Sequence, residues 1–436
     1  MDDALVEQAK EAKVEELSSL EEGSLVDLKG WVYVKSHHGG MVFVRLRDST
    51  GLVQVVFKKN VVGKEKLELA EKLTRESSIR VIGAVHFDKR APGGVEVHAK
   101  DFEVIGSAPS DYPIRPGVGV SVMLDYRHLH LRGVKMTSVW KVYSEMLKAV
   151  REWFEQHGYY EVHVPIFVTA ACEGGATLFE VSYFGRKAYL SQSAQMYLEA
   201  AIFSLEKVYC VQPSFRAEKS RTRRHLTEFW QVEAEVAFAD MWDIIEVEEQ
   251  LLSYVCQKLK ERAWKHLRKF RKKFTPPEPP FPRIKYDEAV DILQSKGVEI
   301  EWGEDFGADE ERVLSKEFDT PFFVTHYPRQ CKAFYHKPDP SNPSVTLSVD
   351  MLAPEGYGEI SGGGQRIDDY QELVESIKLF GLKVEDYGWY LDLRKYGSVP
   401  HSGFGIGLGR TLQWILKAPH IRDVVMFPRT INRVYP

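Results

Sequence analysis

The sequence predicts an α+β protein built from a small β-barrel and a larger domain of mixed strands and helices. Apolar residues recur with a period of two between residues 25 and 104. A stretch rich in proline and glycine follows at 106–119, and helical and strand patterns alternate after residue 136. The chain has 436 residues, which is enough for two or three ordinary domains.

Composition narrows the class of protein. Hydrophobic residues make up 44% and charged residues 28%, as in globular proteins with a large core. The net charge of −5 is not that of a generally basic nucleic-acid binder, so an RNA partner would need a local basic face. No apolar run approaches the roughly 20 residues of a membrane helix, and no signal peptide is indicated. The 4 cysteines are widely spaced, which favours free thiols and a cytoplasmic protein.

The N-terminal region has the element order of an OB-fold barrel. Residues 1–22 are expected to form a charged amphipathic helix. Strands are expected at 25–34, 41–47, 52–57, 79–87 and 94–104, with a helix at 64–75. Short strands in this order, with a helix between the third and the fourth, are typical of the OB-fold.

The larger domain is expected to open with a long helix at 137–157. A strand broken by Pro165 should follow at 159–168, then a helix at 195–205 and a pair of strands within 207–238. A basic helix at 251–274 should end where prolines forbid its continuation. Its lysines and arginines are most simply a solvated face, and an RNA-contacting face is the alternative.

One hairpin in this domain is dense in arginine. Arg216 and Glu218 close its first strand, and its loop carries Arg221, Arg223, Arg224 and His225. Guanidinium groups bind phosphate oxygens through paired hydrogen bonds, and Phe229 could stack on a base. Glu233 and Glu235 share one face of the return strand, where either could hold an ammonium group. In isolation, such a hairpin is more often a solvated loop.

The hairpin is part of a wider pattern. Its F-R-x-E and R-H-x-x-E-F segments resemble motif 2 of the class II aminoacyl-tRNA synthetases, while 140–165 resembles motif 1 and HSGFGIGLGRTL at 401–412 resembles motif 3. GWVYV and FVRLRDSTGLVQVV are similar to the subgroup that charges asparagine, aspartate and lysine. CEGGATLFEV, YLSQSAQMYLEA and EKSRTRRHLTEFW resemble its asparaginyl branch of archaeal and eukaryotic type. The resemblance covers essentially the whole chain.

This resemblance implies an OB-fold anticodon-binding domain at 1–105, a hinge at 106–134 and, at 135–436, a catalytic domain on an antiparallel sheet flanked by helices. The implied reaction is the ATP-dependent activation of L-asparagine to asparaginyl-adenylate and its transfer to the 3' end of tRNA(Asn), by a homodimer with Mg²⁺. Positioning and neutralisation of developing charge would do most of the catalysis.

The resemblance also implies site residues. The implied catalytic residues are Arg216, Arg410 and Glu359. The implied ATP-binding residues are Arg216, Glu218, Arg224, His225, Leu226, Phe229, Glu359, Gly407 and Arg410. The implied amino-acid-binding residues are Glu173, Ser193, Gln195, Glu233, Arg366 and Gly403. The implied metal ligands are Asp350, Glu359 and Ser361, and the implied anticodon contacts are Phe43, Gln54, Arg45 and Arg47.

Departures from related sequences bear on specificity. Leu198 stands where the aspartyl enzymes carry a lysine, so bound aspartate would meet one positive charge fewer, at a cost of several kcal/mol. The alternative is that Leu198 is a core residue and specificity is set elsewhere. Gly409 replaces an acidic residue of motif 3, and Gly364 stands where many relatives have serine. The neighbourhood of Gly364 makes Ser361 a candidate at the metal.

Other activities remain open from the sequence alone. One is an aspartyl-tRNA synthetase, including one that charges both tRNAs, which would want a cation near Leu198. Another is an aspartate–ammonia ligase-type paralogue, whose known relatives lack the barrel. A third is a catalytically inactive RNA-binding or signalling protein, which Gly409 alone favours.

Overall fold

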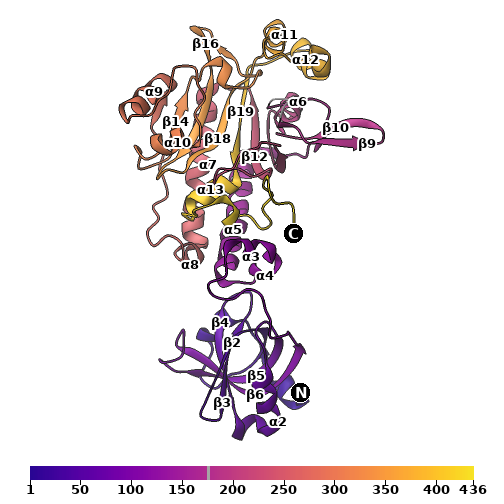
Figure 1. The fold of residues 1–436 in the computed structure, drawn as a ribbon, viewed down its shortest axis with the longest axis vertical. Coiled ribbons are helices and arrows are strands. Elements are labelled where there is room, and N and C mark those ends of the chain that lie inside the picture. Colours follow the sequence, from indigo (N-terminus) through magenta and orange to yellow (C-terminus); the bar gives the residue numbers. More distant parts are fainter. Residues whose placement is uncertain (174–176) are drawn as a thin grey trace. The chain divides into compact units, whose positions relative to one another are not determined.

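The computed structural model describes residues 1–173 and 177–436. The chain divides into two compact units, Met1–Thr137 and Ser138–Pro436 (Figure 1). Residues 106–134, expected as a hinge, are therefore part of the first unit. No helix in the described part of the chain is long and apolar enough to cross a membrane.

The first unit is the predicted OB-fold barrel. Its sheet has the order β1-β2-β3-β4-β6-β5, and β2 also pairs with β5, which closes the barrel. The long strands are β2 (Leu25–His38), β3 (Met41–Arg47), β4 (Leu52–Lys58), β5 (Ser78–Phe87) and β6 (Val95–Gly106), with α2 (Lys59–Lys72) between β4 and β5. The prediction of strands and helix order is confirmed, because side chains alternate between the apolar core and the outside as the period of two requires.

The prediction of one helix over residues 1–22 is wrong. This segment forms α1 (Asp3–Gln8), the short strand β1 (Lys10–Glu11) and the 3-10 helix η1 (Val14–Ser19). Ala12 donates its backbone N–H to the carbonyl of Asp27, and Leu17 is fully buried in the barrel core. Pairing with β2 and burial of Leu17 outweigh a helical pattern that had no tertiary partner.

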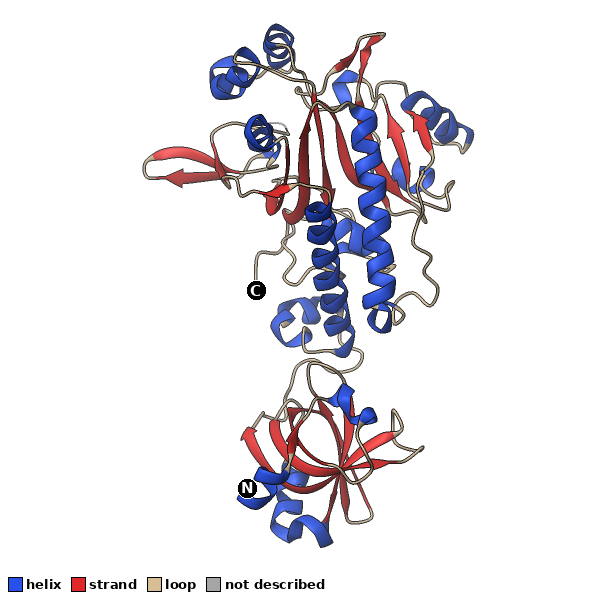
Figure 2. Cartoon of the chain, turned by 180° about the vertical axis from the view of Figure 1, so that it is seen from behind, coloured by secondary structure: helices blue, strands red, loops and turns tan. Residues whose placement is uncertain are grey.

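The second unit is built on one large sheet. Its order is β13-β14-β17-β18-β19-β12-β11-β7, antiparallel except for the β13–β14 and β11–β7 pairs (Figure 2). These strands are β7 (Tyr160–Glu161), β11 (Lys207–Phe215), β12 (Glu228–Ala237), β13 (Arg283–Lys285), β14 (Phe322–Thr325), β17 (Ser348–Ala353), β18 (Gly358–Gln365) and β19 (His401–Gly407). Smaller sheets contain β8 (Phe167–Val168), β9 (Glu180–Tyr183), β10 (Arg186–Leu190), β15 (Pro338–Asp339) and β16 (Asn342–Thr346). The strand expected at 159–168 is thus split into β7 and β8 around Pro165.

Helices flank this sheet. In the described part of the second unit these helices are α5 (Val134–Gln156), which starts at the end of the first unit, α6 (Gln195–Leu205), α7 (Met241–Arg262), α8 (Trp264–Leu267), α9 (Tyr286–Ser295), α10 (Ala308–Leu314), α11 (Tyr370–Leu379), α12 (Gly388–Lys395) and α13 (Leu408–Ile415). The first unit contains two more short helices after the barrel, α3 (Val120–Asp125) and α4 (Arg127–His130). Short 3-10 turns are η3 (Arg329–Cys331), η4 (Val384–Tyr387) and η5 (Ile421–Asp423). The basic helix expected at 251–274 begins earlier, because Asp240 caps the backbone N–H groups of Trp242 and Asp243. It also ends earlier than expected, at Arg262, where the backbone of Ala263 leaves the helical conformation before the short helix α8.

The main core lies between α7 and one face of the large sheet. Ile244 and Leu252 of α7 share an apolar cluster with Met351, Ile360 and Ile406 of the central strands. This cluster uses the apolar alternation of each strand. The opposite face of the same strands carries the polar side chains that form the site.

Candidate active site

The polar face of the large sheet has glycines between two acidic side chains. Asp350, Gly362, Gly405 and Glu233 lie side by side on β17, β18, β19 and β12. Because the two glycines have no side chains, only backbone atoms lie at the centre of this row, and a ligand can approach the sheet closely there. All four residues line a cavity of about 230 Å³.

The next row of the sheet repeats the pattern. Gly364 and Gly403 are paired on β18 and β19, and Gly403 pairs with Glu235 on β12. A Cβ on Gly403 would lie 2.1 Å from the Glu235 carboxyl carbon, so a side chain cannot be accommodated there. Gly364 has φ of +146°, and a Cβ there would lie 2.5 Å from the carbonyl of Leu347. This backbone conformation and close approach account for glycine at 364 in this chain.

A second cavity of about 310 Å³ adjoins the first. The residues that line it and were expected to bind ATP are Arg216, Glu218, Arg224, His225, Leu226, Phe229, Glu359, Gly407 and Arg410. Residues expected to bind the amino acid line the first cavity, namely Glu173, Ser193, Gln195, Glu233 and Arg366. Arg216 and Glu359 line both cavities. The structure therefore brings the two predicted sets together, except for Gly403, which lines neither cavity. Asp305 and Glu311 also line both cavities, so one arginine and three carboxylates lie at the boundary.

Charges in the second cavity are arranged in pairs. Arg410 Nη1 donates to Glu359 Oε2 at 2.7 Å, and the Arg216 guanidinium lies 5.6 Å from the centre of the Phe229 ring. Burial opposes ionisation of Glu359, but Arg410 and Lys332 outweigh it and lower its pKa to about 2. The Glu359 carboxylate is thus ionised at neutral pH.

The remaining motif 2 side chains are held by protein partners. Arg224 Nη2 donates to Glu311 Oε1 at 3.0 Å and Arg224 Nη1 donates to the Tyr357 carbonyl at 3.1 Å, which fixes its guanidinium at the cavity wall. His225 Nδ1 lies 3.1 Å from the Ser220 hydroxyl. Burial, with Arg410 and Arg224 nearby, lowers the pKa of His225 to about 4, so its ring is neutral at pH 7.

Gly409, the departure in motif 3, is explained by packing. It lines the second cavity at the start of α13. A Cβ at this position would lie 3.3 Å from Ile421 Cδ1 and 3.7 Å from Val425 Cγ2. Apolar side chains thus occupy the space that a larger residue would need, and the neighbouring Arg410 keeps its place against Glu359.

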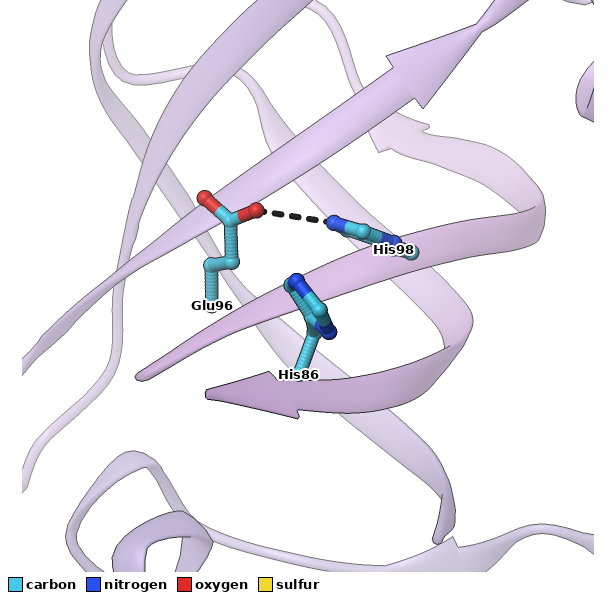
Figure 3. Close-up of side chains that lie close together, drawn as sticks. All are labelled: His86, Glu96 and His98. Carbon is cyan, nitrogen blue, oxygen red and sulfur yellow. Dashed lines mark hydrogen bonds and ion pairs between the residues drawn. The ribbon is translucent and has the colours of Figure 1, made fainter. Parts of the chain in front are cut away.

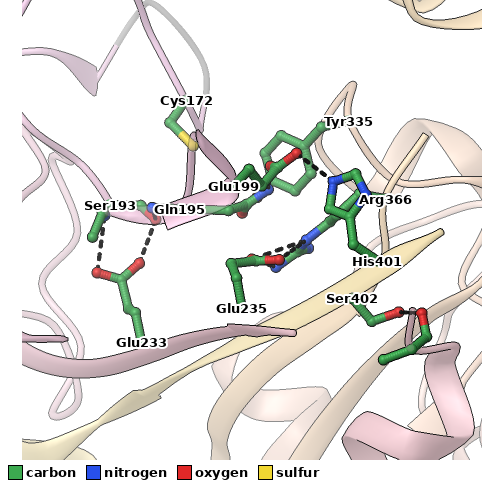
Figure 4. A network of polar contacts seen from close by, with 12 residues as sticks. Cys172, Ser193, Gln195, Glu199, Glu233, Glu235, Tyr335, Arg366, His401 and Ser402 are labelled. Atoms are coloured by element: carbon green, nitrogen blue, oxygen red, sulfur yellow. Dashed lines mark hydrogen bonds and ion pairs between the residues drawn. The ribbon is translucent and has the colours of Figure 1, made fainter. Parts of the chain in front are cut away.

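Two glutamates of β12 have different partners (Figure 4). Glu233 lines the first cavity, whereas Glu235 lies beneath its surface and is paired with Arg366, which does line the cavity. Glu233 accepts hydrogen bonds from the Ser193 hydroxyl and from the backbone N–H of Ala194. Glu235 accepts from Arg366 Nε at 3.1 Å and also from Arg366 Nη2. Burial raises the pKa of both carboxyl groups, although Arg366 opposes this at Glu235. Arg366 also lies over the Tyr335 ring, 5.2 Å from its centre.

A buried network orients Gln195. Gln195 Nε2 donates to Glu199 Oε1 at 3.0 Å. Glu199 is completely buried and also accepts hydrogen bonds from Tyr390 OH, Arg394 and His401. Burial raises the pKa of Glu199, but the positive charges of Arg394 and His401 outweigh this effect, so its pKa is lowered. Glu199 therefore stays ionised and holds one amide proton of Gln195.

Leu198 belongs to the core. It is fully buried in a cluster with Ala194, Ile202, Val208 and Cys210, and it does not line either cavity. The structure thus supports the second sequence interpretation, in which Leu198 packs and specificity is set by other groups. Arg366 lines the first cavity and is held there by the buried Glu235, so this pair is a candidate for that role.

Magnesium would fit the carboxylates at the boundary. A Cβ on Gly362 would lie 3.2 Å from Asp350 Oδ1 and 3.6 Å from Glu359 Oε1, so the two carboxylates converge over this glycine. One or two carboxylates together with substrate phosphates are a typical magnesium site. The Lys332 ammonium contacts Asp350 Oδ2 at 2.5 Å and partly neutralises it. Burial raises the pKa of Asp350 to about 7 although Lys332 opposes it.

Ser361 is not placed as a ligand, and this corrects the sequence prediction. Its cross-strand partners Met351 and Ile406 belong to the apolar core on the α7 side of the sheet. Its hydroxyl donates to the Gly405 carbonyl at 3.2 Å. An irregularity in the β17–β18 pairing next to Met351 shifts the alternation that sequence spacing assumed.

On the barrel, three of the predicted anticodon residues share one outer face. Phe43 and Arg45 lie on β3, and Gln54 lies opposite Arg45 on β4. Arg47 is different: its guanidinium donates to both oxygens of Glu76 at 2.7 and 2.8 Å, and it is only 8% exposed. The expectation that Arg47 neutralises RNA phosphates is therefore wrong, because a buried carboxylate already pairs with it.

Several cavity residues were missed by sequence reasoning. They are Gln231, Asp305, Glu311, Lys332 and Tyr335. Asp305, Glu311, Lys332 and Tyr335 come from loops or from a short helix between motifs 2 and 3, where no periodic pattern marks a binding residue. The segment Gly174–Ala176 of the CEGGATLFEV resemblance lies outside the described residues.

Comparison with known families agrees with the order of the two units. Residues 26–105 match a family described as an OB-fold nucleic acid binding domain. Residues 119–431 match the family of class II tRNA synthetases (D, K and N), which is more than half of the chain.

Individual relatives are similar over nearly the whole length. The asparagine–tRNA ligase of Thermococcus kodakarensis is 57% identical, with 95% of this chain and 97% of the relative covered. The structure of the asparaginyl-tRNA synthetase from Pyrococcus horikoshii complexed with asparaginyl-adenylate has a TM-score of 0.96 at 56% identity, covering 98% of this chain and 100% of that chain. The Entamoeba histolytica asparaginyl-tRNA synthetase in complex with asparaginyl-adenylate has a TM-score of 0.90 at 35% identity, covering 98% and 99%.

Proposed function

The chain belongs to the asparaginyl-tRNA synthetases of class II, and we propose how its two adjoining cavities perform that reaction. The enzyme activates L-asparagine with ATP and transfers it to tRNA. The observation that carries the proposal is the shared boundary, where Arg216 and Glu359 line both cavities. The reacting carboxylate and the α-phosphate have to meet at such a boundary.

ATP occupies the second cavity in this proposal. The adenine ring stacks on Phe229, and Arg410 lies over the nucleotide on its other side. Arg216 binds the α-phosphate, and neutral His225 donates a hydrogen bond to an outer phosphate. Arg224, held by Glu311, shapes the wall and adds positive charge.

Asparagine occupies the first cavity. Its ammonium group lies between Glu173 and Glu233, and a bound cation there favours the ionised form of Glu233, whose pKa burial raises. Its carboxylate accepts the second amide proton of Gln195, since Glu199 holds the first. Its side chain faces Arg366, which lines the cavity and offers several donors, and reaches past the cavity surface to the acceptor Glu235 that Arg366 holds.

The Glu235–Arg366 pair suits a carboxamide. The amide nitrogen donates to Glu235 and the amide oxygen accepts from Arg366. Aspartate would place a second carboxylate beside Glu235 without a further cation. Two like charges about 4 Å apart repel by about 4 kcal/mol at an effective dielectric constant near 20, which corresponds to about a thousandfold in kcat/KM.

The chemistry requires little proton transfer. The asparagine carboxylate attacks the α-phosphorus in line, the bond to the leaving pyrophosphate breaks, and the tRNA 3'-hydroxyl then attacks the adenylate. Arg216 and Arg410 neutralise charge that develops on the phosphate oxygens. Asp350 and Glu359 would hold magnesium, which when bound would neutralise phosphate charge.

The barrel supplies tRNA recognition in this proposal. Phe43 stacks on an anticodon base and the Gln54 amide reads a base edge. Arg45, on the same face, binds a backbone phosphate. The assignment of residues 1–105 to anticodon binding rests on this shared face and on the OB-fold match.

Two further properties belong to the proposal. An apolar groove of about 390 Å³ lined by Trp140, Leu147 and Phe427 suits a second copy of the chain, and the resemblance of 140–165 to motif 1 supports a homodimer contact there. Sedimentation velocity tests this, and a monomer at micromolar concentration would contradict it. Free cysteines fit a reducing cytoplasm.

Aminoacylation tests the complete function. Purified protein with ATP, Mg²⁺ and a tRNA(Asn) transcript should attach labelled asparagine to the transcript and should not attach labelled aspartate. Attachment of aspartate at a similar rate would contradict the assignment. Formation of free asparagine from aspartate and ammonia would identify the paralogue activity instead.

A further inference from the structure

The barrel carries a cluster of imidazole and carboxylate groups that asparagine activation does not use (Figure 3). His86 on β5 lies directly opposite Glu96 on β6, and His98 follows on the same face of β6. One ligand atom from each of these residues lies within 4.8 Å of the others. Glu22 adjoins the cluster, since His86 Nδ1 lies 2.6 Å from Glu22 Oε1.

We propose that His86, Glu96 and His98 form a binding site for a divalent cation of the zinc class. Two imidazole nitrogens and one carboxylate oxygen are a donor set that zinc takes up, with a fourth position left to water. Magnesium and calcium prefer sites made of oxygen alone. The donor set therefore separates this cluster from the carboxylates at the catalytic boundary.

The hydrogen bond to Glu22 prepares His86 as a ligand. A carboxylate can only accept, so Nδ1 of His86 carries the proton and Nε2 keeps its lone pair. The Glu22 carboxylate is itself held by the backbone N–H of Phe87 at 2.8 Å. A carboxylate behind a histidine is the usual way in which zinc-binding imidazoles are oriented and made more basic.

Glu96 and His98 already point toward one another. His98 Nε2 lies 2.8 Å from Glu96 Oε1, and the other oxygen of Glu96 accepts from Gln54 Nε2 at 2.8 Å. Zinc bonds of about 2.0–2.2 Å place neighbouring ligand atoms about 3.3 Å apart, so this contact has to open by roughly half an ångström. The cation takes the place of the proton between them, and that proton is released.

Lys58 is the group that opposes the cation. Its ammonium lies 3.5 Å from His98 Nδ1. When zinc binds Nε2, Nδ1 has to carry a proton, so the half-exposed lysine moves away from it. Two carboxylates, those of Glu22 and Glu96, face this one cation, and the balance of charge still favours a dication.

Zinc titration of the full chain tests the site. Chelator-treated protein is titrated with ZnCl₂ by calorimetry in a buffer that contains Mg²⁺, which fills the oxygen sites of the catalytic cavity. We expect one tight equivalent in the wild type and its loss in the double variant H86A/H98A. His37→Ala is the matched control, because His37 is another barrel histidine with one glutamate partner at 3.4 Å, and it should keep the equivalent.

Two further variants separate ligand roles from general damage to the barrel. Glu22→Gln should weaken zinc binding about 10- to 100-fold, as loss of a group behind a metal-binding histidine does, and Lys58→Ala should strengthen it. ATP–pyrophosphate exchange should be unchanged in H86A/H98A, which also separates this inference from the proposed function.

Absorption spectroscopy at the zinc edge should show two imidazoles on the metal in the wild type. The inference is overturned if the wild type binds no zinc under these conditions, or if H86A/H98A binds the same equivalent. It is also overturned if the spectrum shows no imidazole.

Discussion

Replacing Glu235 by glutamine should reduce the preference for asparagine over aspartate. Glu235 is 1% exposed, so its charge acts on a bound side chain with little screening. Removing the Glu235 charge removes a repulsion of about 4 kcal/mol from an aspartate carboxylate about 4 Å away. This corresponds to a gain of at most about a thousandfold in kcat/KM for aspartate. The substituted side chain still offers asparagine an amide oxygen, which is a weaker acceptor than a carboxylate. The kcat/KM for asparagine should therefore fall about tenfold, since hydrogen bonds to charged groups contribute about 1.5–3 kcal/mol.

The assay is ATP–pyrophosphate exchange, with kcat/KM measured for each amino acid. The ratio of asparagine to aspartate should fall at least a hundredfold in Glu235→Gln. Glu233→Gln is the matched control on the same strand, and it should weaken both substrates alike, because both carry the ammonium group that Glu233 is proposed to bind. An unchanged ratio in Glu235→Gln, with the fold intact by circular dichroism, would refute the reasoning.

Other consequences follow from the same structure. Burial raises the pKa of Glu235, so its protonated fraction grows as pH falls; exchange with aspartate relative to asparagine should therefore be higher at pH 6 than at pH 8, and a flat ratio would contradict this. Phe43→Ala should raise the KM for tRNA about 10- to 100-fold from a lost stacking energy of about 1–3 kcal/mol, with exchange unaffected. Arg47→Ala should destabilise the barrel by up to about 3–5 kcal/mol in denaturant unfolding, because it leaves the buried Glu76 carboxylate with only the longer contact to Arg132 at 3.4 Å. Ser361→Ala should leave the magnesium dependence of exchange unchanged, whereas a shifted dependence would restore it as a ligand.

The barrel was predictable because its strands obey a simple alternation. Val42, Val44 and Leu46 point into the core, while Phe43 and Arg45 point outward, as a period of two requires. The glycine-rich strand of motif 3 was predictable as a floor for the same reason. Gly403 and Gly405 lie on its polar face, opposite the glutamates of β12.

The errors arise where tertiary partners decide. Arg47 fits the outward pattern of β3 less well than its neighbour Arg45, because Glu76 draws it into a buried pair. Ser361 follows an irregular register that no spacing reveals. Lys332 was missed because its partner Asp350 is 18 residues away in a different element. Its position three residues after Gln195 made Leu198 a candidate pocket residue, but both residues lie on the helix α6 and the side chain of Leu198 is buried in the core.

The most direct test of the central claim is ATP–pyrophosphate exchange by the wild-type protein, with asparagine and aspartate compared at equal concentrations. The account predicts exchange that depends on asparagine and is at least a hundredfold weaker with aspartate. Exchange with aspartate equal to or faster than that with asparagine would contradict it, because a carboxylate would then be accepted beside the buried Glu235.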